Sequence, residues 1–135
     1  MSITSMPPRL LELAPLLYVD DIQRSVDFYC QMLGFTVSAR WEPEGKLAWC
    51  RLERDGVPLM LQQANEEDAP AASRGRGVVF FFQCNDAGTL HAELSSRGLP
   101  LSPPEAAFYG MNQVFVKDPD GYELCFQNAI ADEAH

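Results

Sequence analysis

The fold is decided by a pair of similar stretches. Residues 13–37 read LAPLLYVDDIQRSVDFYCQMLGFTV, and residues 78–101 read VVFFFQCNDAGTLHAELSSRGLPL. Each contains an apolar run, an acidic or amide residue, about three helical turns, and then a glycine followed by a new strand-like run. Equivalent residues lie 65 and 64 positions apart: Asp21 with Asp86, and Gly34 with Gly98. Two spacings that agree within one residue indicate an internal duplication of about 64 residues.

Both stretches carry the period of a surface helix. The apolar stripe consists of Ile22, Val26, Tyr29 and Leu33 in the first stretch and of Ala87, Leu90 and Leu94 in the second. Asp20 or Asp21 in the first, and Asn85 or Asp86 in the second, can accept hydrogen bonds from the free N–H groups of the first turn. A glycine follows each stripe and supplies the left-handed residue that ends a helix. We therefore expect one helix of about three turns in each half.

Strand-like runs follow each helix. They cover residues 36–41, 46–53 and 57–62 in the first half and residues 99–104, 112–117 and 122–127 in the second. Asp55-Gly56 stands between two of these runs and is typical of a two-residue hairpin turn. The order β-α-β-β-β thus occurs twice. We predict an α+β fold built from two such modules with mixed sheets, residues 10–63 and 77–128, joined by the linker 64–76 within a single domain, 1–135.

Charge and cysteine content narrow the function classes. The 135 residues include 10 Lys+Arg and 19 Asp+Glu, and the resulting net charge of −9 disfavours nucleic acid and favours a cationic small molecule. Cys30, Cys50, Cys84 and Cys125 are far apart and include no Cys-x-x-Cys pair, as expected for free thiols in a reducing compartment. The N-terminal residues have no basic region, and Glu12 interrupts the first apolar stretch, so we expect neither a signal peptide nor a membrane span. The interpretation is a cytoplasmic protein with no membrane partner.

Two longer motifs resemble a known superfamily. They are LLYVDDIQRSVDFYCQMLGF at residues 16–35 and VKDPDGYELCFQ at residues 116–127. With the order of elements, they resemble the vicinal oxygen chelate superfamily, which includes glyoxalase I, extradiol dioxygenases, fosfomycin-resistance enzymes and bleomycin-resistance proteins. The resemblance covers residues 13–128 and implies the glyoxalase/bleomycin resistance fold, in which each module forms a curved four-stranded sheet and paired modules enclose a cavity.

Enzymes of this superfamily hold a divalent metal at four strand positions. The resemblance places these positions at Ala14, Met60, Val79 and Cys125. The first three cannot ligate a hard or borderline cation, and one soft thiol does not make a site. The chain has only two histidines, one on the second helix and one at the last residue, so composition argues against a histidine-ligated core metal and against a Ser–His–acid triad. We therefore predict no metal, no cofactor and no catalytic residue, as in the bleomycin-resistance branch.

Strand parity predicts which residues line the cavity. Around the Asp55-Gly56 turn, Trp49 lies opposite Gln62, and Met60 marks the cavity side because it occupies an expected ligand position. The same parity on the other strands gives the predicted ligand-binding set: Trp41, Trp49, Arg51, Met60, Gln62, Phe81, Gln83, Gln113, Phe115, Cys125 and Gln127. Aromatic walls with several amides suit a planar or amphipathic organic ligand held by stacking and hydrogen bonds.

These observations favour one function and leave two others open. The preferred function is metal-independent binding of a small, aromatic and cationic molecule, a bleomycin-resistance-like sequestration. The alternatives are a lyase or oxygenase of the same superfamily with altered metal ligands, and a non-catalytic partner subunit. Open aromatic sheet faces predict a homodimer with cavities shared between chains, and the resemblance implies the same assembly.

Overall fold

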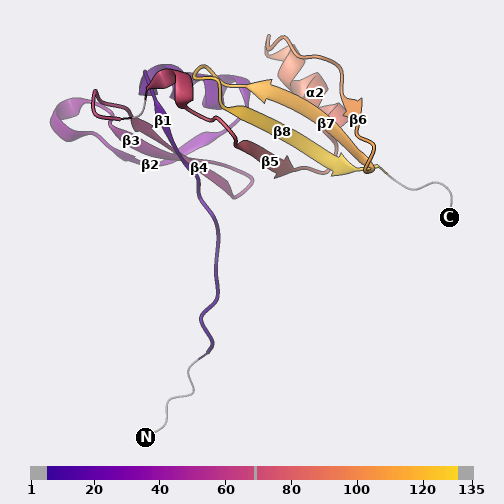
Figure 1. The fold of residues 1–135 in the computed structure, drawn as a ribbon, viewed down its shortest axis with the longest axis horizontal. Helices are drawn as coiled ribbons and strands as arrows, with labels where there is room; N and C mark the ends of the chain where they lie inside the picture. The colour runs from indigo at the N-terminus through magenta and orange to yellow at the C-terminus, as the bar shows by residue number, and fades with distance from the viewer. Residues whose placement is uncertain (1–5, 69, 131–135) are drawn as a thin grey trace, which may run out of the picture.

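The computed structural model describes residues 6–68 and 70–130, which form two sheets of four strands each (Figure 1). The strand order is β1-β4-β3-β2 in the first sheet and β5-β8-β7-β6 in the second. In each sheet the first and last strands of the module pair in parallel, and the other pairs are antiparallel. This arrangement confirms the predicted α+β fold of two tandem βαβββ modules.

The first module runs from β1 to β4. Its elements are β1 (Leu16–Val19), α1 (Ile22–Asp27), the π-helix η1 (Phe28–Met32), β2 (Thr36–Trp41), the 3-10 helix η2 (Pro43–Gly45), β3 (Trp49–Arg54) and β4 (Val57–Gln63). The Asp21 carboxylate accepts a hydrogen bond from the N–H of Arg24 at 3.1 Å and caps α1 as predicted. All four residues of the predicted stripe are buried. The predicted helix is α-helical only in its first half, because the chain widens into a π-helix from Phe28 onward.

The second module repeats this order. Its elements are β5 (Val79–Gln83), α2 (Ala87–Ser96), β6 (Glu105–Ala106), β7 (Met111–Lys117) and β8 (Glu123–Ala129), preceded in the linker by the 3-10 helix η3 (Ala71–Ser73). Asp86 caps α2 by accepting a hydrogen bond from the N–H of Thr89 at 3.0 Å. Across residues 6–68 and 70–130, no helix combines the length and the apolar character needed to span a lipid bilayer.

Two predicted strands differ from those observed. β3 begins at Trp49 rather than at Lys46, because the N–H of Lys46 is used in the η2 turn, where it bonds the carbonyl oxygen of Pro43 at 3.1 Å, and pairing with β2 starts only at Trp49 opposite Trp41. The predicted strand at residues 99–104 is irregular, and only the short β6 follows it. Three prolines in that segment lack the N–H group that a strand ladder requires.

The two predicted hairpin registers are confirmed. Asp55 and Gly56 have φ values of 52° and 79°, as a type I′ turn requires, and the turn places Trp49 opposite Gln62. In the second module, the β7–β8 hairpin pairs Phe115 with Cys125. Since side chains opposite each other share a face, these registers fix which residues point to the same side of each sheet.

The turn between β7 and β8 joins the two modules through buried polar contacts. The Tyr29 hydroxyl of η1 donates a hydrogen bond to Asp118 Oδ2 at 2.8 Å, and burial raises the pKa of that carboxyl. The Asp120 side chain is only 2% exposed and accepts hydrogen bonds from the Asp20 N–H (2.9 Å) and the Ser25 hydroxyl (3.2 Å). The modules therefore meet at a specific polar seam as well as through apolar packing.

The linker is exposed shortly after its start, where the Ala64 N–H bonds the Val19 carbonyl oxygen at 2.9 Å, and it is fixed at its end. Residues 65–67 are exposed. Arg74, in contrast, forms an ion pair with an aspartate of the first module and lies 3.8 Å from Asp120 of the second. Gly75 follows with a φ of 74°, and a Cβ at this position would come within 2.9 Å of the Tyr122 ring. The linker is thus anchored to both modules from Arg74 onward.

Candidate functional site

Each sheet has one face against the core and one face open to solvent. Along β1, Leu17 and Val19 are buried, whereas Leu16 and Tyr18 are exposed. The registers extend this alternation across both sheets. Face A is formed by Leu16, Tyr18, Ala39, Trp41, Trp49, Arg51, Glu53, Met60 and Gln62, and face B by Val79, Phe81, Gln83, Glu105, Gln113, Phe115, Lys117, Glu123, Cys125 and Gln127.

The predicted ligand-binding residues are divided between these two faces. Face A holds Trp41, Trp49, Arg51, Met60 and Gln62, and face B holds Phe81, Gln83, Gln113, Phe115, Cys125 and Gln127. The structure therefore brings the set together as two groups on different sheets. Within one chain the predicted lining is a pair of open surfaces, because Trp41 on face A and Phe81 and Phe115 on face B are exposed to solvent, while Trp49 is half-buried.

Face A carries a row of aromatic side chains that crosses the sheet. The register places Tyr18 beside Gln62, Gln62 beside Trp49, and Trp49 beside Trp41. Tyr18 is exposed and was not among the predicted site residues. The alternation of β1, in which Leu17 and Val19 are the apolar core residues, was the signal that could have identified it.

The charge of Arg51 on face A is already paired. Its terminal nitrogens donate to the two Glu12 carboxylate oxygens at 2.7 and 3.0 Å, and its Nε donates to Glu53 at 2.8 Å. These carboxylates raise the pKa of Arg51. One guanidinium and two carboxylates leave this cluster with a net charge of −1, so a ligand on face A meets no free positive charge at this point. Sequence reasoning treated Glu12 only as an interruption of an apolar stretch, because nothing local indicates a partner 39 residues away.

Face B combines an aromatic row with an amide row. Phe81 and Phe115 lie on either side of Cys125 in the register. Both rings are exposed, while Cys125 between them is fully buried. Burial raises the pKa of the Cys125 thiol to about 11, so the thiol stays protonated near neutral pH and is a poor nucleophile. Cys125 forms the floor between two rings and does not itself extend toward a ligand.

The loop before β7 adds two aromatic residues that the sequence prediction omitted. Phe108 is almost completely exposed and packs edge-on against the ring of Tyr109. The Tyr109 hydroxyl accepts a hydrogen bond from the side-chain amide of Gln113 on face B. The loop therefore borders face B, a position that depends on the β6–β7 connection rather than on any local pattern.

The donor set does not fit a divalent metal ion. Within the described part of the chain, no three His, Cys, Asp or Glu side chains come together in a group that could hold one. The positions that the sequence resemblance predicts for metal ligands carry a methionine on β4, a valine at the start of β5 and a buried thiol on β8. The methionine and the valine are not ligands for a hard or borderline cation, and a single thiol does not make a site.

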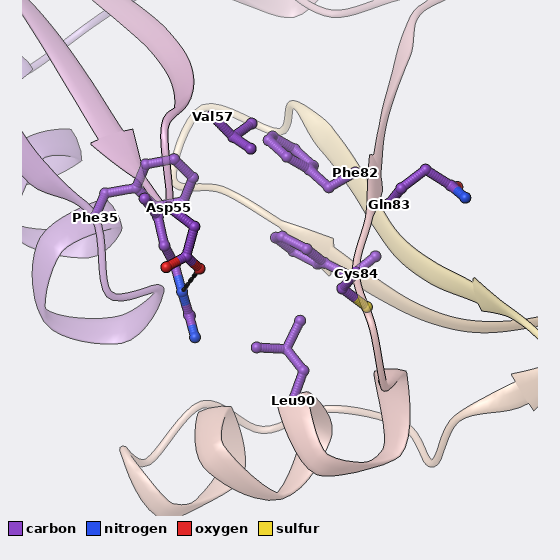
Figure 2. Close-up of a pocket in the computed structure, with 9 residues that line it drawn as sticks. Phe35, Asp55, Val57, Phe82, Gln83, Cys84 and Leu90 are labelled. Atoms are coloured by element: carbon purple, nitrogen blue, oxygen red, sulfur yellow. Dashed lines mark ion pairs between the residues drawn. The ribbon is translucent and has the colours of Figure 1, made fainter.

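A separate crevice of about 110 Å³ lies between the modules (Figure 2). Its lining consists of Phe35, Val57, Phe82, Leu90 and Phe126 with Arg54, Asp55, Gln83 and Cys84. The Arg54 guanidinium is held by Glu93 of α2 at 2.9 and 3.0 Å, and it also bonds the carbonyl oxygen of Leu33 at 2.8 Å. Only Gln83 belongs to the predicted set. The crevice arises from packing between modules, which strand parity within a module does not predict.

The sequence and the fold both have relatives among known proteins. The family model described as the Glyoxalase/Bleomycin resistance protein/Dioxygenase superfamily matches residues 9–126. The chain belongs to this superfamily. Membership in the glyoxalase/bleomycin resistance superfamily confirms the predicted resemblance. A comparison with curated protein sequences gave no match.

Solved structures of the glyoxalase/bleomycin resistance superfamily share the fold. A glyoxalase/bleomycin resistance protein/dioxygenase from Nocardioides is 24% identical, with 98% of this chain and 89% of that chain covered and a TM-score of 0.68. A bleomycin resistance determinant encoded on the transposon Tn5 is 20% identical over 89% of this chain and 98% of its own, with a TM-score of 0.72. TnmS3, an antibiotic-binding protein from Streptomyces sp. CB03234, is 18% identical over 92% and 99%, with a TM-score of 0.71.

Proposed function

We propose that this protein binds a small, aromatic and cationic molecule without a metal ion, and sequesters it between a face A and a face B. The observation that carries the proposal is the exposure of large aromatic side chains on both faces, 60% for Trp41, 52% for Phe81 and 42% for Phe115. Contiguous exposed apolar surface of this kind normally marks a binding site. A flat ligand placed between two such faces is stacked on both sides.

The cationic character of the ligand is supported by the charge and by the aromatic row of face A. The net charge of −9 attracts cations at long range. The rings of Tyr18, Trp41 and Trp49 can each present a π-face to a positive group. Two proteins of the same fold, a bleomycin resistance determinant and an antibiotic-binding protein, support the same class of ligand for this chain.

Replacing Trp49 by alanine is expected to weaken binding of a planar cationic probe such as ethidium by about 3- to 30-fold, the range of a cation–π contact. In the unmodified protein, ethidium should quench tryptophan fluorescence and raise the melting temperature. A fluorescence titration of both proteins at equal concentration, with metal chelator present throughout, measures the change.

The matched control for this experiment is Val57→Ala. Val57 is another exposed apolar residue of the same sheet, but it lines the crevice between the modules and not the aromatic row. The proposal expects V57A to bind ethidium as the unmodified protein does. Weaker ethidium binding in V57A with unchanged binding in W49A would indicate that ethidium binds in the crevice, and it would contradict the proposed site.

A homodimer is the assembly that would bring a face A onto a face B. One chain leaves both faces open, and a two-fold axis lets each module meet the opposite module of its partner. Three leucines of the N-terminal arm, Leu10, Leu11 and Leu13, are also exposed, and the arm extends away from the body (Figure 1). Such surface is typical of an interface with a second copy.

Light scattering at micromolar concentration is expected to give twice the mass of the chain. The double substitution Leu11→Ser and Leu13→Ser should shift the protein toward monomer and weaken ethidium binding in parallel, because the shared cavity is lost. A monomer mass for the unmodified protein together with intact ethidium binding would show that one chain completes its own site.

A further inference from the structure

Three glutamines form a hydrogen-bonded row across face B. The register places Gln83 of β5 opposite Gln127 of β8, and Gln127 opposite Gln113 of β7. Gln127 Nε2 donates to Gln83 Oε1 at 2.6 Å, and Gln113 Nε2 donates to Gln127 Oε1 at 2.9 Å. The row ends at Tyr109, whose hydroxyl oxygen accepts from Gln113 Nε2. Side-chain amides on three adjacent strands are thus fixed by one another rather than by solvent.

Both ends of this row present hydrogen-bond donors. Gln83 uses its amide oxygen to accept from Gln127, so its two N–H groups remain, and they meet no acceptor among residues 6–68 and 70–130. Tyr109 accepts from Gln113 and keeps its own hydroxyl hydrogen, which likewise bonds to no described residue. The complementary ligand edge therefore carries acceptors, such as carbonyl oxygens.

The glutamine row lies beside a second row of the same length that carries two phenyl rings. Each strand contributes a second residue, two positions away from its glutamine. The register places these residues, Phe81, Cys125 and Phe115, in line. Because neighbouring strands are about 4.8 Å apart, three strands give both rows a span of roughly 10 Å. A flat ring system of two or three fused rings can rest on Phe81 and Phe115 while its edge meets the amides.

The sister module shows that the fold does not require this row. Gln127 and Gln62 are equivalent, 65 residues apart, but the neighbours of Gln62 are Tyr18 and Trp49 rather than glutamines. The same scaffold position is therefore compatible with aromatic side chains. The row of three amides is a property of face B alone, and on β6 it is followed by Glu105, which the register places opposite Gln113.

From these contacts we infer that face B recognises the uncharged, oxygen-bearing edge of a polycyclic aromatic ligand, such as a ring carbonyl. The inference rests on the proposed function, because it assigns the two ends of one ligand to different faces. The cationic group lies on the aromatic row of face A, and the acceptor edge accepts hydrogen bonds from Gln83 and Tyr109 on face B.

The test uses two probes that differ only in the acceptors. One is 9,10-anthraquinone with a trimethylammonium-methyl substituent, and the other is anthracene with the same substituent. The unmodified protein is expected to bind the anthraquinone about tenfold more tightly. Gln83→Leu, at an exposed position, should reduce this preference to about threefold, because Tyr109 still donates, while leaving the affinity for the anthracene within about threefold. Gln62→Leu, the matched change on face A, should preserve the preference.

The outcomes separate this inference from the proposed function. Equal affinity of the unmodified protein for both probes, with both weakened by Trp49→Ala, would leave the proposed function standing and overturn the role of face B. A tenfold preference that survives in both Gln83→Leu and Tyr109→Phe would overturn it as well. If neither probe binds at millimolar concentration, both proposals are wrong. Isothermal titration calorimetry and melting temperature, measured on each variant, distinguish loss of binding from loss of folding.

Discussion

Replacing Asp120 by alanine is expected to lower the free energy of unfolding by about 3–5 kcal/mol, the cost of removing one partner from a buried ion pair. The Asp120 carboxylate accepts hydrogen bonds from the Asp20 N–H and the Ser25 hydroxyl, and it lies within 3.6 and 3.8 Å of Arg24 and Arg74. Alanine would leave the Asp20 N–H and the Ser25 hydroxyl without their acceptor at the point where the modules meet, and it would remove one of the carboxylates beside Arg74. Urea unfolding followed by circular dichroism measures the loss.

The control is Glu42→Ala. Glu42 is also a carboxylate in an ion pair, with Arg40 at 3.8 Å, but both side chains are largely exposed. Exposed pairs contribute about 0–1 kcal/mol, so this variant should unfold close to the unmodified protein. Similar losses in both variants would mean that Asp120 has no special role at the seam.

Replacing Tyr29 by alanine is expected to destabilise the protein by about 3–5 kcal/mol, as for other buried aromatic residues. The Tyr29 ring is fully buried and packs edge-on against Phe28 and Phe35, with ring centroids 5.5 and 5.8 Å away. Tyr29→Phe keeps the ring and removes only the hydrogen bond to Asp118, so it should cost about 1–2 kcal/mol.

Thermal and urea unfolding of the two Tyr29 variants distinguish packing from hydrogen bonding. Asp118 keeps hydrogen bonds from the N–H groups of Asp120 and Tyr122 in either variant, both at 2.9 Å. The carboxylate is therefore not left without a partner when the hydroxyl is lost. A Tyr29→Phe variant as unstable as Tyr29→Ala would show that the seam depends on the hydroxyl and not on the ring.

Local chemistry made the fold predictable. Asp55-Gly56 permits only a tight turn, and that turn fixes the register of β3 against β4 and hence the side to which Trp49 points. Asp21 and Asp86 cap their helices because each can reach an N–H three residues ahead. Each of these features is decided by residues that are neighbours in the sequence.

For the site, strand parity predicted the side of the sheet on which each residue lies, but not the contacts of its side chain. Parity placed Trp49 and Phe115 on open faces, but it cannot show that Arg51 is neutralised by Glu12 or that Cys125 is covered by its neighbours. The row that ends at Tyr109 depends on how the loop before β7 lies over the sheet. These contacts join segments that are distant in the sequence and form only when the chain is packed. A local sequence pattern therefore cannot predict them.

The linker has a consequence for how the two modules stay together. Residues 65–67 near its start are exposed and, among the described residues, their hydrogen bonds run within 65–68, while Arg74 and Gly75 are part of the packed structure. The exposed portion of the linker therefore tethers the two modules. A short tether gives the two parts that it joins an effective concentration of the order of millimolar. The contacts around Asp120 therefore need only modest affinity to hold the modules together. Residues at this contact can change after duplication without separating the two modules.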